Sequence, residues 1–114
     1  MQIEVLDRSI PVALVVPAGR LDALSAPELR RRCDTILDGE TDRLVIDLRA
    51  VDFCDSAGLA ALVGAMKRSR ADGGDTKLVA AEDAPVWRIL ELTRFDRVFD
   101  VRVGVDDAVG AFAS

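Results

Sequence analysis

The sequence of 114 residues contains no histidine. A Ser-His-Asp hydrolase, a phosphohistidine carrier, a histidine general base and the common zinc sites all use an imidazole, so the sequence excludes these classes. The segment Cys54–Gly58 also lacks the leading glycine of a nucleophile elbow. We therefore predict no catalytic residue, and Ser56 is not expected to act as an activated nucleophile.

Cysteine is scarce, and glycine-rich phosphate loops are missing. The two cysteines, Cys33 and Cys54, have no metal-ligand spacing, so we predict two reduced thiols and no metal site. A redox role for Cys54 is the alternative, although the neighbouring Asp55 would raise its thiol pKa. Gly73-Gly74 is interpreted as a turn rather than a nucleotide cradle. No cofactor is predicted.

No apolar run is long enough to span a bilayer, and the first residues do not resemble a signal peptide. We therefore expect a cytoplasmic protein without membrane insertion. The net charge of −5 and the pI of about 4.7 disfavour binding to nucleic acid. Half of the residues are apolar, which suits a single domain over residues 1–114.

Charged clusters coincide with predicted helices. Arg30–Arg32 lies within one helix and Lys67–Arg70 in the last turn of another, so both are interpreted as solvated faces. Arg68 could alternatively contact an acidic partner. The acid pairs Glu82-Asp83 and Asp106-Asp107 fall at predicted helix starts, where the helix dipole favours them.

Alternating strands and helices after an opening hairpin predict an α/β fold. We expect a mixed, mostly parallel sheet of four to five strands that opens with an antiparallel hairpin, together with about four helices. Trp87 is interpreted as a packing residue of one helix. The predicted strands are 3–6, 12–16, 44–48, 77–80 and 98–103, and the predicted helices are 25–38, one from residue 57, one after Pro85, and 106–112.

The strand at 44–48 leads to Asp55-Ser56, directly before a helical pattern of apolar residues. Asp55 or Ser56 is thereby placed at the helix N-cap, where a side-chain oxygen accepts hydrogen bonds from free N–H groups. The same position favours anions, so a phosphoryl group on Ser56 would be accommodated there. A plain N-cap serine is the alternative.

Three segments resemble one protein family. Val51–Leu59 is similar to the phosphorylation motif of the bacterial anti-sigma factor antagonists, which are built on the STAS domain, and Gly19–Leu29 resembles their Gly-x-Leu-Asp signature. Leu92–Phe99 is similar to the closing turn and strand of that family. The likeness therefore covers nearly the whole chain, and it implies a STAS-type fold.

The resemblance implies a binding protein without catalysis of its own. Its unphosphorylated form would bind an anti-sigma factor that is also a serine kinase and so release the sigma factor; phosphorylation of Ser56 would end this binding until a serine phosphatase resets it. Asp22, Asp55 and Ser56 would form the centre of the interface. The full set of partner-binding residues implied is Asp22, Asp55, Ser56, Ala57, Gly58 and Leu59.

Two positions depart from the family pattern: Ala57 stands where a second hydroxyl is frequent, and Arg94-Phe95 where glycine is common. Gly58 is interpreted as a partner contact, whereas Gly64 and Ala65 are assigned to internal packing.

The alternative functions are a STAS scaffold or transport-associated subunit without a switch, and a small-molecule or nucleotide-binding module. A phosphotransfer receiver is disfavoured because Val16-Pro17-Ala18, at the end of the strand at 12–16, supplies no acid pair.

Overall fold

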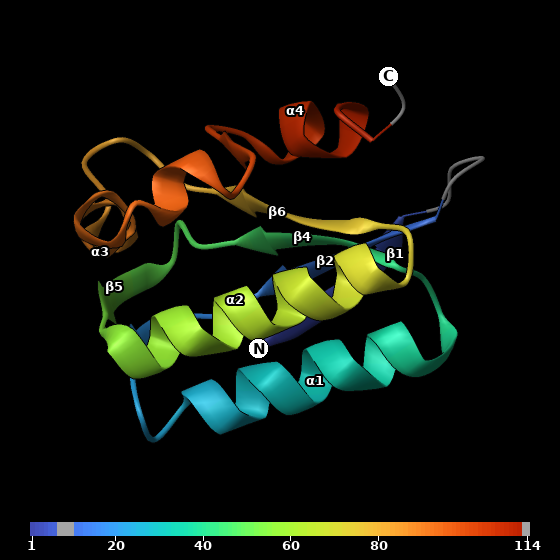
Figure 1. Ribbon diagram of the computed structural model, residues 1–114, viewed down its shortest axis with the longest axis horizontal. Coiled ribbons are helices and arrows are strands. Elements are labelled where there is room, and N and C mark those ends of the chain that lie inside the picture. Colours follow the sequence, from blue (N-terminus) through green and yellow to red (C-terminus); the bar gives the residue numbers. More distant parts are fainter. Residues whose placement is uncertain (7–10, 113–114) are drawn as a thin grey trace.

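The computed structural model describes residues 1–6 and 11–112. Within them, the main sheet has five strands in the order β1-β2-β4-β6-β7 (Figure 1). The turn of the predicted hairpin includes residues 7–10 and lies outside the described residues. The strands of this sheet are β1 (Gln2–Leu6), β2 (Val12–Val16), β4 (Arg43–Asp47), β6 (Asp75–Val79) and β7 (Val101–Arg102).

The main sheet begins with an antiparallel pair and continues in parallel. β1 pairs antiparallel with β2, and the pairs β2–β4, β4–β6 and β6–β7 are all parallel. Each parallel neighbour needs a crossover connection, and helices provide it. The predicted α/β class, the opening hairpin and the mostly parallel sheet are thus confirmed.

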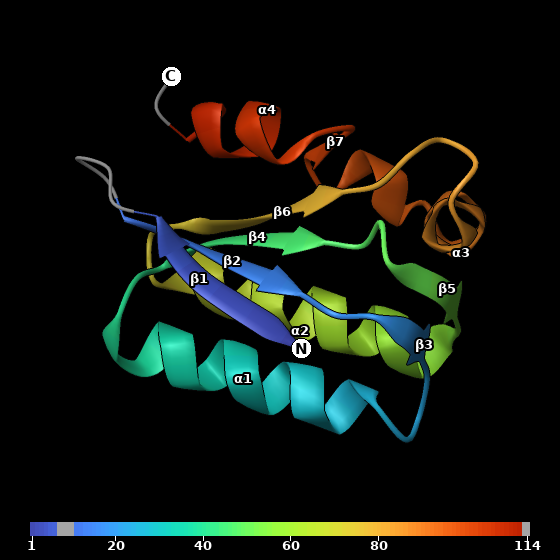
Figure 2. The same ribbon diagram turned by 180° about the vertical axis from the view of Figure 1, so that it is seen from behind.

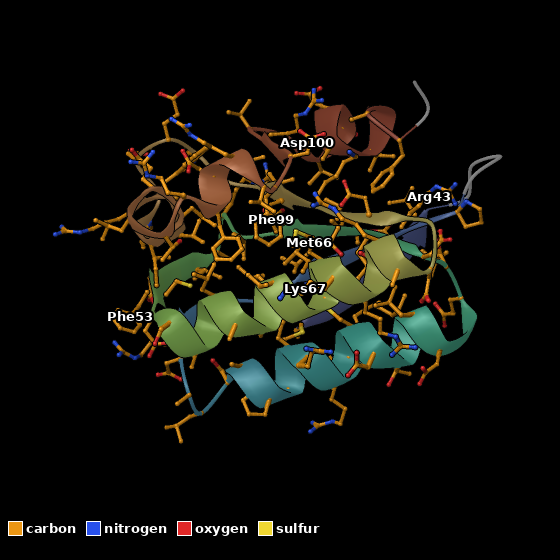
Figure 3. All side chains as sticks on the ribbon, in the orientation of Figure 1. Arg43, Phe53, Met66, Lys67, Phe99 and Asp100 are labelled. Atoms are coloured by element: carbon orange, nitrogen blue, oxygen red, sulfur yellow. The ribbon has the colours of Figure 1, made fainter. Side chains whose placement is uncertain are left out.

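Helices cover the two faces of this sheet unequally. α1 and α2 lie side by side on one face, α4 lies on the other, and α3 sits at one end (Figures 1 and 2). The larger core lies under α1 and α2, where Met66 of α2 and Phe99 are both buried (Figure 3). The helices are α1 (Ala26–Gly39), α2 (Ser56–Ala71), α3 (Pro85–Thr93) and α4 (Val105–Gly110).

A second, two-stranded sheet was not anticipated. β3 (Gly19–Leu21) pairs in parallel with β5 (Val51–Cys54) at the end of the molecule where α2 begins (Figure 2). Gly19 is the first residue of β3 and has a φ of 76°, which glycine adopts without strain where the chain passes from β2 into β3. β4 ends at Asp47, so β5 and not the central strand leads directly into α2.

The C-terminal elements are shorter than predicted. The strand expected at 98–103 is reduced to β7, and a 3₁₀ helix, η1 (Phe95–Arg97), stands before it. Arg94 adopts a φ of 67°, the left-handed conformation that ends α3, within the Arg94-Phe95 pair where the resembled family commonly has glycine. The helix expected at 106–112 spans Val105–Gly110.

Arg68 joins the two neighbouring helices α1 and α2. Its guanidinium forms ion pairs with Asp34, at 3.2 Å, and with Asp38, both on α1. The alternative interpretation of Arg68 as a contact for an acidic partner is therefore replaced by a bridge inside the molecule. Gly64 of α2 faces the guanidinium of Arg30 on α1, which confirms its assignment to internal packing.

Candidate partner-binding and phosphorylation site

The start of α2 is capped by Asp55. Its carboxylate Oδ1 accepts hydrogen bonds from the backbone N–H groups of Ala57 and Gly58, at 2.9 and 3.1 Å. Ser56 is the first residue of the helix and is exposed. The cap function therefore belongs to Asp55, which leaves the Ser56 hydroxyl outside the capping interaction. Its surroundings combine the positive end of a helix dipole with one adjacent carboxylate.

Asp22 organises the loop between β3 and α1. Its Oδ1 accepts from the N–H groups of Leu24 and Ser25, at 3.0 and 3.3 Å, and its Oδ2 accepts from the Arg20 guanidinium at 3.2 Å. Desolvation raises the pKa of Asp22, but these donors outweigh it, so the pKa of the carboxyl is lowered overall. Asp22 therefore remains ionised at neutral pH and shapes the loop beside the start of α2.

The small sheet places Asp22 beside the α2 N-terminus. Leu21 pairs with Cys54, and the N–H of Asp55 donates to the Leu21 carbonyl at 3.3 Å. The residues that follow these two strands therefore leave the sheet at the same end. Phe53 lies at this end of the molecule (Figure 3), and its ring lies 4.0 Å from the Arg20 guanidinium carbon. The structure thus brings the three predicted central residues into one region.

A shallow apolar hollow is lined in part by Ala57, the residue after Ser56, and it was not predicted from the sequence. The hollow has a volume of ≈ 370 Å³ and lies between the first turns of α1 and α2. Beside it, Leu24 is 92% exposed on the β3–α1 loop. In the sequence, the apolar Leu24 in a loop and the small residues in the first turns of α1 and α2 are the features that could have indicated this hollow. The lining residues are Ala23, Ala26, Pro27, Arg30, Ala57, Ala60 and Ala61.

Two residues of the expected interface face inward. Gly58 and Leu59 are both buried. A Cβ atom on Gly58 would overlap the backbone carbonyl oxygen of Leu21 and approach its Cγ to 2.8 Å. The small size of Gly58 is thus required by the close approach of α2 to β3, and its interpretation as a partner contact gives way to internal packing. Ala57 is half-buried and lines the hollow.

Both thiols are free; Cys33 is buried and Cys54 is half-buried. Burial raises the pKa of Cys33 to about 12, with a smaller contribution from Asp34. Burial likewise raises the pKa of Cys54 to about 11, helped by the charge of Asp55. Neither thiol forms a thiolate at neutral pH, which favours structural roles for both. Among residues 1–6 and 11–112, no cluster of acids and thiols has the arrangement of a metal site.

Comparisons with known proteins identify the family. A model of the STAS domain matches residues 3–108. The chain belongs to the STAS domain family. The anti-sigma-B factor antagonist of Bacillus subtilis is 32% identical to this STAS protein over 84 residues, which make up 74% of the chain and 75% of that relative. The resemblance stated from the three sequence segments is thereby confirmed.

Solved structures share the STAS fold. The crystal structure of an anti-sigma factor antagonist from Mycobacterium paratuberculosis is 30% identical, with a TM-score of 0.83 and coverage of 99% of this chain and 94% of that chain. The Bacillus anti-sigma factor antagonist SpoIIAA matches in both of its forms. The unphosphorylated form is 21% identical and covers 95% of this chain and 92% of that chain. The phosphorylated form is 20% identical and covers 96% of each chain. Both have a TM-score of 0.70. No helix of the described residues has the length and apolar character needed to cross a membrane.

Proposed function

We propose that this STAS protein is an anti-sigma factor antagonist controlled by phosphorylation of Ser56. The unphosphorylated form binds an anti-sigma factor with serine kinase activity and thereby frees a sigma factor. Phosphorylation of Ser56 ends the binding, and a separate serine phosphatase restores it. The exposed Ser56 hydroxyl, next to the Asp55 cap at the start of α2, is the observation that carries this proposal.

The proposed interface consists of the exposed part of this region. Asp22, Asp55 and Ser56 supply the polar centre, and the hollow with Leu24 supplies the apolar part. Large exposed apolar side chains beside a groove are typical of binding surfaces. The protein binds through this surface and is itself the substrate of kinase and phosphatase, with no catalysis of its own. It acts in the cytoplasm as one STAS domain over residues 1–114.

Charge alone is sufficient for the switch. A phosphoryl group adds about −1.5 to −2 charges at neutral pH. One pair of like unit charges about 5 Å apart costs roughly 0.8 kcal/mol in water and roughly 3 kcal/mol at an effective dielectric constant of 20. Since about 1.4 kcal/mol is a tenfold change in affinity, a phosphate beside one acidic group of the partner would weaken binding about tenfold to a thousandfold.

The fold has room for the modified side chain. Ser56 is exposed in the first helical turn, so a phosphate there meets the positive end of the α2 dipole and requires no rearrangement of the half-buried Asp55 cap. We therefore propose a change of surface charge and no change of fold.

Phosphorylation is tested directly by intact-mass and fragment mass spectrometry. The protein is purified with its partners from its native cells and then incubated with ATP. We expect one added phosphate on Ser56, none in the Ser56→Ala variant, and normal modification in Thr35→Ala, which removes an exposed hydroxyl of α1. An unmodified Ser56 in a stable complex would contradict the switch.

A STAS scaffold without a switch is the second candidate. The apolar hollow and the exposed Leu24 favour it, because they provide a binding surface whether or not Ser56 is modified. A Leu24→Ser variant would weaken partner capture under both proposals. Only the switch predicts that phosphorylation of Ser56 weakens capture as well.

A further inference from the structure

β1 forms one end of the main sheet, and its outer edge is free. In the strand order β1-β2-β4-β6-β7, β1 pairs only with β2 among the described residues (Figure 2). Alternate residues of an antiparallel strand point their N–H and C=O groups to opposite sides, so half of the residues of β1 direct theirs away from β2. These backbone groups have no strand partner within residues 1–6 and 11–112. Such an edge can accept a strand from another molecule.

One face of this edge is apolar. Ile3 lies opposite Val15 of β2, and residues paired across two strands share a face of the sheet. Val5 likewise lies opposite Ala13. Both β2 residues are fully buried in the core under α1 and α2, whereas Ile3 and Val5 are 39% and 47% exposed. Met1, two positions before Ile3, is also 39% exposed. The apolar core thus continues to the edge of the sheet and remains partly open to solvent there.

The two edges of the main sheet differ in how they resist further pairing. Proteins protect exposed edges with short strands, prolines, bulges or charged side chains. At the opposite edge, β7 contains two residues, and the side chain of Arg102 forms ion pairs there. β1 contains five residues in regular register with β2, no proline and one charged residue, Glu4. β1 is therefore the edge that remains open to a partner strand.

We propose that β1 pairs antiparallel with β1 of a second copy of this chain, about a two-fold axis at Ile3. In this register, Ile3 lies opposite Ile3 of the second copy, and Met1 lies opposite Val5. Gln2 lies opposite Glu4, so its amide donates to the carboxylate. Apolar residues thus meet apolar residues on one face, and polar residues meet polar residues on the other. The edge is complementary to itself, as a symmetric dimer requires.

Other arrangements match the β1 edge less well. A register centred on Glu4 would place the two Glu4 carboxylates opposite each other, and like charges in directly opposed positions destabilise a sheet. An open-ended assembly is disfavoured because the dimer uses the β1 edge of both copies. It leaves only the two short β7 edges at the ends of the joined sheet. The expected product is therefore a closed dimer in which two five-stranded sheets form one.

The size of the interface predicts a weak dimer. Standard protein–protein interfaces contain about 20 to 30 residues on each side. β1 supplies five residues from each copy, with Met1 beside them. We therefore expect dimerisation with a Kd of about 10 to 100 µM, so that the monomer dominates in dilute solution.

The dimer edge contains none of the residues proposed for partner binding. Those residues lie in the β3–α1 loop and in the first turns of α1 and α2, whereas β1 belongs to the main sheet. The dimer is argued from β1 alone. Its failure would therefore leave the proposed switch at Ser56 untouched, and failure of the switch would leave the dimer untouched.

Sedimentation velocity tests the dimer. We expect the mass of the unmodified protein to rise from one copy to two between about 1 µM and 500 µM. Ile3→Lys and Val5→Lys should each raise the Kd at least about tenfold, because they place two cations in the apolar strip. The control is Val103→Lys, which adds the same charge at a residue that is 68% exposed beside β7 and should leave the Kd unchanged. Circular dichroism verifies that each variant is folded.

Two results would overturn the dimer. A monomer at every concentration, or growth into species larger than two copies, would contradict a closed dimer of this chain. Unchanged dimerisation in both β1 variants would contradict its location at β1.

Disulfide cross-linking tests the register. Directly opposed residues place their Cβ atoms about 4.5 to 5.5 Å apart, close to the disulfide range, and diagonal neighbours lie farther apart. Under mild oxidation at about 100 µM, Ile3→Cys should form the intermolecular disulfide about tenfold faster than Glu4→Cys. The unmodified protein, with Cys33 buried and Cys54 half-buried, provides the background rate. Equal rates, or faster cross-linking in Glu4→Cys, would overturn the register centred on Ile3.

Discussion

At the scale of single residues, three residues at the start of α2 have separate roles. Asp55 satisfies two backbone donors, Ser56 leaves its hydroxyl exposed, and Gly58 allows β3 to approach the helix closely. The local pattern predicted Asp55 or Ser56 as the cap, and the family resemblance indicated Ser56 as the candidate phosphoacceptor. The role of Gly58 was not predictable, because its contact with Leu21 joins segments that are far apart in the chain and has no local signature.

The two glycines of α2 provide a matched test of this division. In Gly58→Ala, the added Cβ meets the Leu21 backbone, which cannot move cheaply, so we expect a destabilisation of about 1 to 3 kcal/mol. In Gly64→Ala, it meets only the flexible guanidinium of Arg30, and the better helix propensity of alanine offsets the displacement. We expect a change of less than about 1 kcal/mol. Urea denaturation of both variants measures the difference, and equal effects would contradict the proposed packing.

At the scale of secondary structure, long apolar elements were predictable and short ones were not. β2, β4 and α2 carry clear apolar patterns and were located within one or two residues. β3 and β7 contain three and two residues, too few to show a period, and their pairing depends on strands elsewhere in the chain. The hollow beside Ser56 was missed for the same reason, since α1 and α2 form it jointly.

Ion pairs stabilise the pairing of β6 with β7. Lys77 is nearly buried, and its ammonium lies 2.8 Å from a carboxylate oxygen of Asp100, which also pairs with Arg102 at 2.7 Å. The hydrogen bond from Arg102, opposed by desolvation and supported by Lys77, lowers the pKa of Asp100. The folded state therefore favours the ionised carboxylate.

Asp100→Asn should accordingly destabilise the protein by about 1 to 3 kcal/mol, because the ammonium of Lys77 loses its nearest counter-charge. The matched control is Asp107→Asn, whose carboxylate also pairs with Arg102 but is more than half exposed. It should cost less than about 1 kcal/mol. Urea denaturation at neutral pH compares them, and a larger loss in the control would show that Lys77 does not need Asp100.

At the scale of the whole molecule, pKa shifts of both signs limit the pH range of stability. The pKa values of Asp22, Asp47 and Asp100 are lowered by folding, so the stability they contribute is present above about pH 4, their unfolded range, and is lost as the pH falls through the folded values. The pKa of Cys33 is raised to about 12. Its contribution is complete below about pH 8.5 and is lost as the pH rises toward about 12.

Cys33→Ala tests the alkaline limit. In the unmodified protein, we expect the free energy of unfolding to fall above about pH 9, by about 1.4 kcal/mol per pH unit from this thiol. The Cys33→Ala variant loses some packing energy at every pH. Its free energy of unfolding should, however, fall less steeply with rising pH than that of the unmodified protein. Urea denaturation between pH 7 and 10 measures the slopes. Parallel curves for the two proteins would show that Cys33 does not set this limit.

The molecule as a whole gathers the features proposed for anti-sigma factor binding at one end. The Ser56 region and the apolar hollow both include residues that directly follow β5. The small β3–β5 sheet thus positions the functional surface, while the main sheet and its helices supply the core. The three sequence segments pointed to the STAS family, and the structure shows how two of them meet.

The central claim is tested most directly by the affinity of the two forms for one partner. The anti-sigma factor captured with the Ser56→Ala variant is titrated by calorimetry against the unphosphorylated protein and against protein carrying one phosphate on Ser56. We expect phosphorylation to raise the Kd about tenfold to a thousandfold, while the circular dichroism of the free protein stays unchanged. Equal affinities of the two forms would contradict a switch at Ser56.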